Sequence, residues 1–351
     1  MKLFTLGPVA MYPETLQIAA QQLPYFRTDE FSKIMLENEA CLKRLLHLSN
    51  GRVVMISGSG TAAMEAVVSC SLSNKDRVLI INGGTFGARF TQLCRLYQIP
   101  YDTIDVPFSE SLTPEQLETI DGSRYTALLV NIHETSTGQL YSIELLSAFV
   151  KKYGLYFIVD AISSFGADPY QMDEYGIDCT ILSSQKALAL SPGISMIAMQ
   201  ESFYKEMVEP KEDHQLYLSI KEHVKNMKRG QTPNTPAVGI LLELQDRLRR
   251  IEEQGIDVMC EETASRAAYF RDQMKKLSIQ VPEYSLSNAL TPILLPDQAV
   301  SVYEKLKDKY GIYVTPSGGD LKNQLLRVGH LGNQSLDDYE ELLLRLKECV
   351  L

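Results

Sequence analysis

Residues 155–186 read LYFIVDAISSFGADPYQMDEYGIDCTILSSQK, and this stretch gives the strongest indication of the fold. It contains two short apolar runs, Leu155–Val159 and Cys179–Leu182, which predict buried strands. Asp160 follows the first run and Lys186 comes shortly after the second. Strands that are apolar throughout indicate a parallel sheet covered on both faces. Since such sheets bind ligands at the carboxyl ends of their strands, Asp160 and Lys186 are candidate site residues.

The same alternation of apolar runs and amphipathic stretches extends on both sides of this segment. Further strands are predicted at Arg52–Ile56, Arg77–Ile81, Ala127–Ile132 and Ile194–Met199. Helices are predicted at Glu30–Leu48, Ala62–Leu72, Ala88–Tyr97 and Ser142–Tyr153. Strands separated by helices predict an α/β domain built on a mostly parallel sheet.

The pattern changes in the last third of the chain. Residues 236–277 are largely helical, with a break expected at Gly255. Strand candidates then mix with helices, namely Leu290–Leu295, Ile312–Thr315 and Leu325–Val328 with Ala299–Tyr310 and Leu336–Val350. We therefore predict a large domain at residues 1–257, with the N-terminal segment at the active-site entrance, and a small C-terminal α+β domain at residues 258–351.

The composition excludes several classes of protein. The 351 residues carry a net charge of −10, with a pI near 5.2, which disfavours binding to nucleic acid or to an anionic membrane surface. No apolar run approaches the roughly 20 residues of a membrane span, and no secretory signal is visible. The six cysteines are scattered without a metal-ligand spacing, so we expect no metal site and a cytoplasmic location.

A Gly- and Ser-rich turn, Ser57-Gly58-Ser59-Gly60-Thr61, joins a predicted strand to a predicted helix. Small residues at a helix N-terminus allow backbone N–H groups to surround an anion such as a phosphate. An ordinary capped turn is the alternative. The turn lacks the last glycine of the dinucleotide fingerprint, because Ala63 stands there, and the chain has no nucleoside-triphosphate loop.

Asp160 and Lys186 each have an ordinary explanation as well. An Asp at a strand end often caps the next turn, and most lysines are solvated at the surface. However, a buried carboxylate requires a positive partner, and a protonated ring nitrogen would supply one. A partly buried lysine has the lowered pKa that a Schiff-base lysine needs. The order of phosphate turn, strand-end Asp and strand-end Lys is specific where each feature alone is not.

That order is typical of fold-type I enzymes dependent on pyridoxal 5′-phosphate. Over nearly its whole length the chain resembles the class V aminotransferases, above all the alanine–glyoxylate, serine–pyruvate and serine–glyoxylate branch, with 2-aminoethylphosphonate–pyruvate transaminases as near relatives. The runs that carry the resemblance are SGSGTAAMEAV, NGGTFGARF, HETSTGQL, VDAISSFGADP, SSQKALALSPG and LLRVGHLG. The resemblance implies an α/β large domain with a mostly parallel seven-stranded sheet between helices.

The resemblance also implies roles for individual residues. Lys186 would hold the cofactor as a Schiff base and later move the substrate proton. Asp160 would pair with the pyridinium nitrogen. The cofactor phosphate would be bound by Ser59, Gly60, Thr61 and Gln185.

Further roles are implied for side chains around the cofactor ring and the substrate. Phe86 would stack on the ring and Thr135 would contact its phenolic oxygen. Arg327 would bind the substrate carboxylate, since a guanidinium suits that planar group, and Arg27, near the entrance, would also bind the substrate. Thr235 resembles a residue that reaches the phosphate of the neighbouring subunit's cofactor, which implies a homodimer with active sites at the subunit interface.

The predicted reaction is transamination from L-alanine or L-serine to glyoxylate or pyruvate. A 2-aminoethylphosphonate–pyruvate transaminase is the alternative. A cysteine desulfurase fits less well, because Gln185 stands where that class usually has His and residues 281–326 contain no Cys. A non-catalytic protein on the same fold would need an added binding module, and the sequence shows none.

Overall fold

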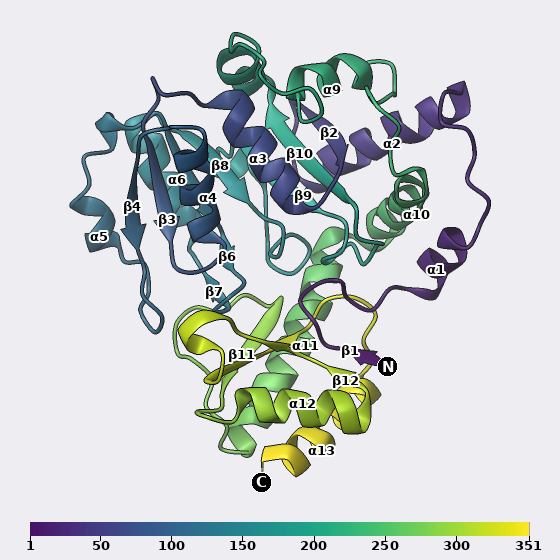
Figure 1. Ribbon diagram of the computed structural model, residues 1–351, viewed down its shortest axis with the longest axis vertical. Helices are drawn as coiled ribbons and strands as arrows, with labels where there is room; N and C mark the ends of the chain where they lie inside the picture. The colour runs from purple at the N-terminus through teal and green to yellow at the C-terminus, as the bar shows by residue number, and fades with distance from the viewer. Residues whose placement is uncertain (351) are drawn as a thin grey trace.

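Seven strands form the central sheet of the computed structural model, which describes residues 1–350 (Figure 1). Their order is β2-β10-β9-β8-β5-β3-β4, and only β10 runs antiparallel to its neighbours. The predicted mostly parallel sheet is therefore confirmed. The strands are β2 (Gly51–Ser57), β3 (Val78–Asn82), β4 (Tyr101–Asp105), β5 (Ala127–Asn131), β8 (Tyr156–Asp160), β9 (Cys179–Ser183) and β10 (Ile194–Gln200).

One strand of this sheet was missed in the sequence. β4 reads YDTID, and of its five residues only Ile104 is buried. It lies at the edge of the sheet and pairs with β3 alone. An edge strand with one solvated face carries polar residues, so it lacks the continuous apolar run that identified the inner strands.

Helices connect the strands and cover the sheet. α3 packs on β9 and β10, α4 on β3 and β5, and α6 on β8. α6 ends at Gly154, whose φ of +67° lies in the left-handed region that favours glycine. The helices of this part are α1 (Pro13–Ala19), α2 (Asp29–Leu45), α3 (Gly60–Ser71), α4 (Gly87–Leu96), α5 (Pro114–Glu118), α6 (Ile143–Tyr153), α7 (Met172–Tyr175), α8 (Glu201–Phe203), α9 (Ile220–Met227) and α10 (Val238–Gln254).

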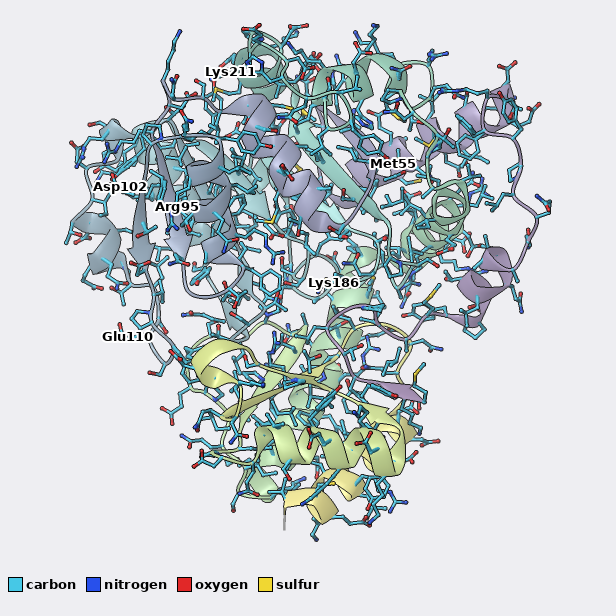
Figure 2. All side chains as sticks on the ribbon, in the orientation of Figure 1. Met55, Arg95, Asp102, Glu110, Lys186 and Lys211 are labelled. Atoms are coloured by element: carbon cyan, nitrogen blue, oxygen red, sulfur yellow. The ribbon has the colours of Figure 1, made fainter. Side chains whose placement is uncertain are left out.

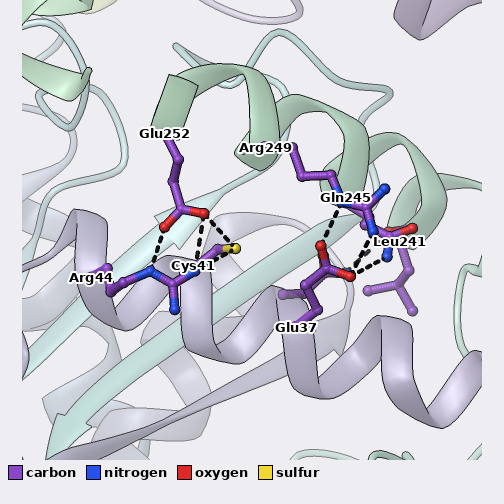
Figure 3. Close-up of polar contacts among 8 residues, drawn as sticks. Glu37, Cys41, Arg44, Leu241, Gln245, Arg249 and Glu252 are labelled. Carbon is purple, nitrogen blue, oxygen red and sulfur yellow. Dashed lines mark hydrogen bonds and ion pairs between the residues drawn. The ribbon is translucent and has the colours of Figure 1, made fainter. Parts of the chain in front are cut away.

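α2 packs against α10 at one end of the sheet, and polar contacts fix how the two helices align. Figure 3 shows Glu37 bound to Arg249 and Gln245, and Glu252 bound to Arg44. The two Arg side chains are more than half exposed, so these ion pairs set the register of the helices and contribute little stability. This alignment matters for the site because α10 also carries Glu243.

The C-terminal part has a second hydrophobic core. Its sheet has the order β11-β14-β13, and Gly255, at φ +94°, separates α10 from α11 as predicted. The elements are α11 (Ile256–Lys276), β11 (Leu290–Leu294), α12 (Ala299–Tyr310), β12 (Ile312–Tyr313), β13 (Thr315–Pro316), β14 (Leu325–Gly329) and α13 (Leu336–Val350). No helix within residues 1–350 is both long and apolar enough to cross a lipid bilayer.

The first residues of the chain pack with this second core. β1 (Lys2–Leu3) pairs with β12, and the Phe4 ring lies against Tyr339 of α13. The predicted division placed the whole N-terminal segment with the large domain. In the structure the chain instead starts in the second core and then passes along the junction between the two parts (Figure 1).

Candidate active site

Five strands bring the predicted site residues to one edge of the sheet. β2, β9, β8, β5 and β3 all run in the same direction, so their carboxyl ends lie at the same edge of the sheet, with the antiparallel β10 between β2 and β9. The loops that leave these ends carry the phosphate turn, Lys186, Asp160, Thr135 and Phe86, in that spatial order. Figure 2 shows Lys186 at this edge, where the large part of the molecule meets the C-terminal part.

Lys186 follows β9 in a loop that its neighbours hold firmly. Its Nζ donates a hydrogen bond to the Leu6 carbonyl oxygen at 2.7 Å. Buried Glu243 of α10 accepts hydrogen bonds from the Ser191 N–H at 2.8 Å and its hydroxyl at 3.0 Å, which fixes the far end of the loop. Burial lowers the pKa of Lys186 to about 8, although the Asp160 carboxylate opposes the shift. Lys186 can therefore present a neutral amine near neutral pH.

Asp160 is the last residue of β8, and its side chain is only 5% exposed. One carboxylate oxygen accepts a hydrogen bond from the Ile162 N–H at 2.9 Å, the only one that this carboxylate accepts within residues 1–350. Burial raises the pKa of Asp160 to about 7, while the positive charges of Lys186 and Arg89 act in the opposite direction. A cation placed against the free oxygen would restore the ionised form.

The phosphate turn opens α3 and has free hydrogen-bonding capacity. Ser59 is exposed at the N-cap position, and its side chain makes no capping bond to the helix. Gly60 packs so closely on the next loop that a Cβ would lie 2.3 Å from Ile162 Cδ1. Ser183, in front of Lys186, donates to the Gln185 side-chain oxygen at 2.5 Å. The Ala62 N–H donates to the Ser59 carbonyl oxygen, so the N–H groups of Gly60 and Thr61 are the ones available for an anion at this turn.

Phe86 is held by a buried carboxylate that sequence reasoning did not single out. Glu134, in β6 (His133–Glu134), accepts hydrogen bonds from the N–H groups of Phe86 at 3.3 Å and Gly87 at 2.9 Å. It also accepts from the N–H and hydroxyl of Ser136. Thr135 and Ser163 share a hydrogen bond of 2.7 Å between their hydroxyls. Glu134 thus fixes the loop that presents the aromatic ring.

Arg327, in β14, is a buried guanidinium without a carboxylate partner in the described part of the chain. Its Nη1 donates to the Thr135 carbonyl oxygen at 2.7 Å and its Nη2 to the Pro316 carbonyl oxygen at 2.8 Å. Its Nε is buried with no hydrogen-bond partner. Burial lowers the pKa of Arg327 to about 10. Such a cation is stabilised by a bound carboxylate.

Over residues 1–350, two predicted site residues, Arg27 and Thr235, are not joined to the side chains described above. Arg27 donates to the Gln231 side-chain oxygen at 3.0 Å and to the Thr232 carbonyl oxygen at 2.8 Å. Thr235, a few residues further on, is exposed. No hydrogen bond or ion pair in residues 1–350 joins either of them to Lys186 or Arg327, and their roles at the site remain predictions.

These features match the chemical groups of pyridoxal 5′-phosphate. Asp160 is an unpaired buried carboxylate that suits a ring nitrogen, and the start of α3 suits a phosphate. Lys186 offers an amine of lowered pKa for covalent attachment, and Phe86 offers an aromatic face. All of these residues lie at one sheet edge, so the geometry fits the cofactor.

The sequence family agrees with this geometry. The family model described as aminotransferase class-V matches residues 20–315. The chain belongs to the class-V aminotransferase family. Its cofactor is accordingly pyridoxal 5′-phosphate, and its fold is that of the fold-type I aminotransferases.

Individual relatives match over almost the whole chain. The soluble hydrogenase small subunit of Synechococcus sp. (strain PCC 6716) is 30% identical over 93% of this chain and 86% of its own length. The serine–glyoxylate aminotransferase of Hyphomicrobium methylovorum is 25% identical, over 94% and 84%. The solved structure of alanine–glyoxylate aminotransferase from Nostoc sp. matches with a TM-score of 0.93 at 25% identity, covering 99% of this chain and 95% of that one.

Proposed function

We propose that this enzyme transfers the amino group of a small amino acid, L-alanine or L-serine, to glyoxylate or pyruvate. The observation that carries the proposal is the buried guanidinium of Arg327, which has an unpaired Nε and lies close enough to Lys186 to lower the pKa of that amine. One such group suits a substrate with one carboxylate. The serine–glyoxylate and alanine–glyoxylate relatives support this substrate class.

Each predicted side chain has a physical task in this proposal. Bound pyridoxal 5′-phosphate supplies an electron-accepting ring that stabilises negative charge at the substrate Cα. Asp160 holds the proton on the ring nitrogen, and Phe86 fixes the plane of the ring by stacking. Ser59, Gly60, Thr61 and Gln185 would hold the cofactor phosphate, and Thr135 would contact the phenolic oxygen.

Lys186 attaches the cofactor and, once the amino donor displaces it, acts as the base at the reacting carbon. It takes the proton from the substrate Cα and delivers it to the cofactor C4′, for which a pKa near working pH is well suited. Arg327 orients the substrate by its carboxylate. The acceptor then enters the same site and the steps run in reverse, so the kinetics should be ping-pong.

The alternative, 2-aminoethylphosphonate as donor, has less support. A phosphonate carries a larger negative charge and would gain from a second free cation. Arg271 is a partly buried cation of the C-terminal part, but it already donates to the carbonyl oxygens of Ser287 and Leu290 and to the Thr291 hydroxyl. A cysteine desulfurase is also disfavoured, because all six cysteines are buried.

We further propose a homodimer in which Thr235 reaches the partner's cofactor phosphate and Arg27 holds the 231–233 segment in place. The exposure of Thr235 supports this, as does a set of exposed apolar side chains. They include Leu23 at 47%, Tyr25 at 68%, Leu216 at 91% and Tyr217 at 44%. Apolar side chains in this number are typical of a surface that a partner subunit covers. The buried, unpaired cysteines agree with a reducing compartment such as the cytoplasm.

A donor screen tests the proposal. The holoenzyme is mixed with L-alanine, L-serine, L-aspartate or 2-aminoethylphosphonate, and the visible absorbance of the bound cofactor is followed. We expect L-alanine or L-serine to remove the band and glyoxylate or pyruvate to restore it. Removal by the phosphonate alone would contradict the proposed substrate class.

The covalent attachment is tested separately on the same preparation. Borohydride reduction followed by peptide mapping should label Lys186 and no other residue. The Lys186→Met variant is the control and should take no label. A label elsewhere would overturn the assignment of the catalytic lysine whichever donor proves active.

A further inference from the structure

Arg89 contacts two of the proposed cofactor-binding residues at once. It lies in the first turn of α4, three residues after Phe86. Its Nη1 donates a hydrogen bond of 2.8 Å to the Thr61 hydroxyl oxygen, at the start of α3. Its guanidinium carbon lies 5.2 Å from the centroid of the Phe86 ring. One side chain therefore joins the phosphate turn to the aromatic residue that stacks on the ring.

The charge of Arg89 is not neutralised by the protein. No carboxylate lies within ion-pair distance of it in residues 1–350, whereas Arg77 and Arg52 are paired with Asp102 and Glu201. The partly buried guanidinium is near enough to Asp160 to lower the pKa of that carboxyl group against the effect of burial. An unpaired cation held beside an anion-binding turn indicates that the missing negative charge comes from a ligand.

The turn itself has the capacity to bind that charge. The side chain of Ser59 is exposed and makes no capping bond, and the N–H groups of Gly60 and Thr61 have no hydrogen-bond partner within residues 1–350. Arg89 uses one of its five N–H donors on Thr61, which leaves donors for an oxygen at the same turn. A guanidinium has the fork geometry that suits phosphate oxygens.

We propose that Arg89 is a positioning residue for the cofactor: it supplies positive charge beside the phosphate and holds the Thr61 turn and the Phe86 ring at a fixed separation. The inference rests on the proposed placement of the phosphate at Ser59, Gly60 and Thr61. It makes Arg89 a determinant of selectivity for the phosphorylated cofactor over pyridoxal, which shares the ring and the aldehyde but has no phosphate.

The experiment compares the two ligands on cofactor-free protein. Dissociation constants for pyridoxal 5′-phosphate and pyridoxal are measured by spectroscopic titration for the wild type, Arg89→Met and Arg89→Lys. We expect Arg89→Met to weaken binding of the phosphorylated cofactor about 10- to 100-fold and to change pyridoxal binding less than about threefold. Arg89→Lys should recover part of the loss. Inorganic phosphate should compete with the cofactor less well in Arg89→Met than in the wild type.

Arg95→Met is the matched control. Arg95 lies on the same helix, away from Lys186 (Figure 2), and donates to the Tyr101 hydroxyl at 2.9 Å. Its removal should leave both dissociation constants unchanged. Melting temperatures of the cofactor-free proteins show whether each variant is folded.

Two results would overturn the inference. If Arg89→Met weakened the binding of both ligands equally, Arg89 would only stabilise the loop. If both dissociation constants stayed unchanged, Arg89 would have no role at the site. A wild type that binds both ligands equally would instead refute the phosphate placement on which the inference rests. None of these results would alter the labelling of Lys186 or the outcome of the donor screen, so the two proposals can fail separately.

Discussion

Two regions of the molecule contain a buried carboxylate and an arginine that is buried or partly buried, and they differ in how well these groups are paired. The first is the proposed active site, with Asp160 and Arg327. The second, which we call the latch, consists of Asp168, Arg271, Ser287 and Asn288. Asp160 ends β8 and Asp168 lies in the loop after it, and burial raises the pKa of each, to about 7 for Asp160 and about 6 for Asp168.

In the latch, hydrogen bonds satisfy both oxygens of the carboxylate. Asp168 accepts from the Ser287 hydroxyl at 2.5 Å and from the Asn288 N–H at 2.9 Å. Arg271 donates to the Ser287 and Leu290 carbonyl oxygens and to the Thr291 hydroxyl. These bonds tie a loop of the first core to the segment that enters β11. The latch therefore has a structural task.

In the active site the corresponding groups are left partly unpaired. Asp160 accepts one hydrogen bond, and Arg327 has a buried Nε with no partner. Burial and shifted pKa values are common to both regions, so they do not identify a site. What separates the two regions is unused hydrogen-bonding capacity, which costs stability unless a ligand satisfies it.

The two regions should differ most, in activity and in stability, when the carboxylate of each is changed to its amide. Asp160→Asn removes the negative charge that keeps the ring nitrogen protonated. We expect the rate of transamination to fall at least about 100-fold, which is the size of effect found when a group that controls protonation in the reaction is removed. Stability of the cofactor-free protein should change little, since a neutral amide is easier to bury than a carboxylate.

Asp168→Asn should have the opposite profile. Its amide NH₂ would meet the Ser287 hydroxyl or the Asn288 N–H, so a buried donor would lose its acceptor at a cost of about 1–3 kcal/mol. Urea denaturation and steady-state kinetics on both variants measure the two effects. If Asp160→Asn unfolded the protein, or Asp168→Asn abolished turnover at unchanged stability, the distinction between site and latch would be wrong.

The sequence identified one side of this comparison and missed the other. Asp160 and Lys186 were predictable because each follows a buried strand, and parallel strands bring their carboxyl ends to one edge. Gly87 and Glu134 are 47 positions apart in the sequence, and Leu6 and Lys186 are 180 apart. The hydrogen bonds that join each pair follow from no local sequence pattern. The latch was not predicted for the same reason, because Ser287 of the C-terminal part donates to Asp168 of the large part across the junction between them.

Arg89 and Glu134 show which signals were available. Both lie in runs that carry the family resemblance, Arg89 in NGGTFGARF and Glu134 in HETSTGQL, yet neither run shows what the charge contacts. A charged residue within a buried turn must be paired or hydrogen-bonded, but the sequence does not say by which residue. Only the fold shows that Glu134 is paired by N–H groups of α4 and that Arg89 contacts Thr61.

A second, smaller difference is expected between Arg327 and Arg271, in the effect of a lysine substitution on the KM and on the melting temperature. Arg327→Lys keeps a positive charge but loses the fork that holds a carboxylate. We expect the KM for the amino acid donor to rise about 10- to 100-fold, equivalent to a charged hydrogen bond, with a smaller effect on kcat. The melting temperature should stay close to that of the wild type.

Arg271→Lys provides the comparison for that result. A lysine cannot reach the two carbonyl oxygens and the hydroxyl that Arg271 contacts, so the melting temperature should fall while the KM changes little. A raised KM in Arg271→Lys would place this residue in the substrate site and would revive the phosphonate donor, which needs a second cation.

The smallest expected effect is in the pH dependence of stability of the cofactor-free protein. Both carboxylates have a folded-state pKa raised above the ordinary value of 3.8, so the folded protein retains protons that the unfolded chain has released. Stability must therefore fall as pH rises, from about pH 4 up to about 7 for Asp160 and up to about 6 for Asp168. Asp160→Asn should flatten the curve through pH 7, whereas Asp168→Asn should flatten it only below pH 6.

Adding the cofactor should change the pH dependence of stability that comes from the active site but not the part that comes from the latch. When the protonated ring nitrogen pairs with Asp160, the ionised carboxylate becomes the favoured form, and the loss of stability between pH 6 and 7 should disappear. The part that Asp168 contributes below pH 6 should persist, because the latch does not touch the cofactor. Urea titrations at several pH values, with and without pyridoxal 5′-phosphate, measure this. If the cofactor changed the slope equally in the wild type and in Asp160→Asn, the ring nitrogen would have a partner other than Asp160.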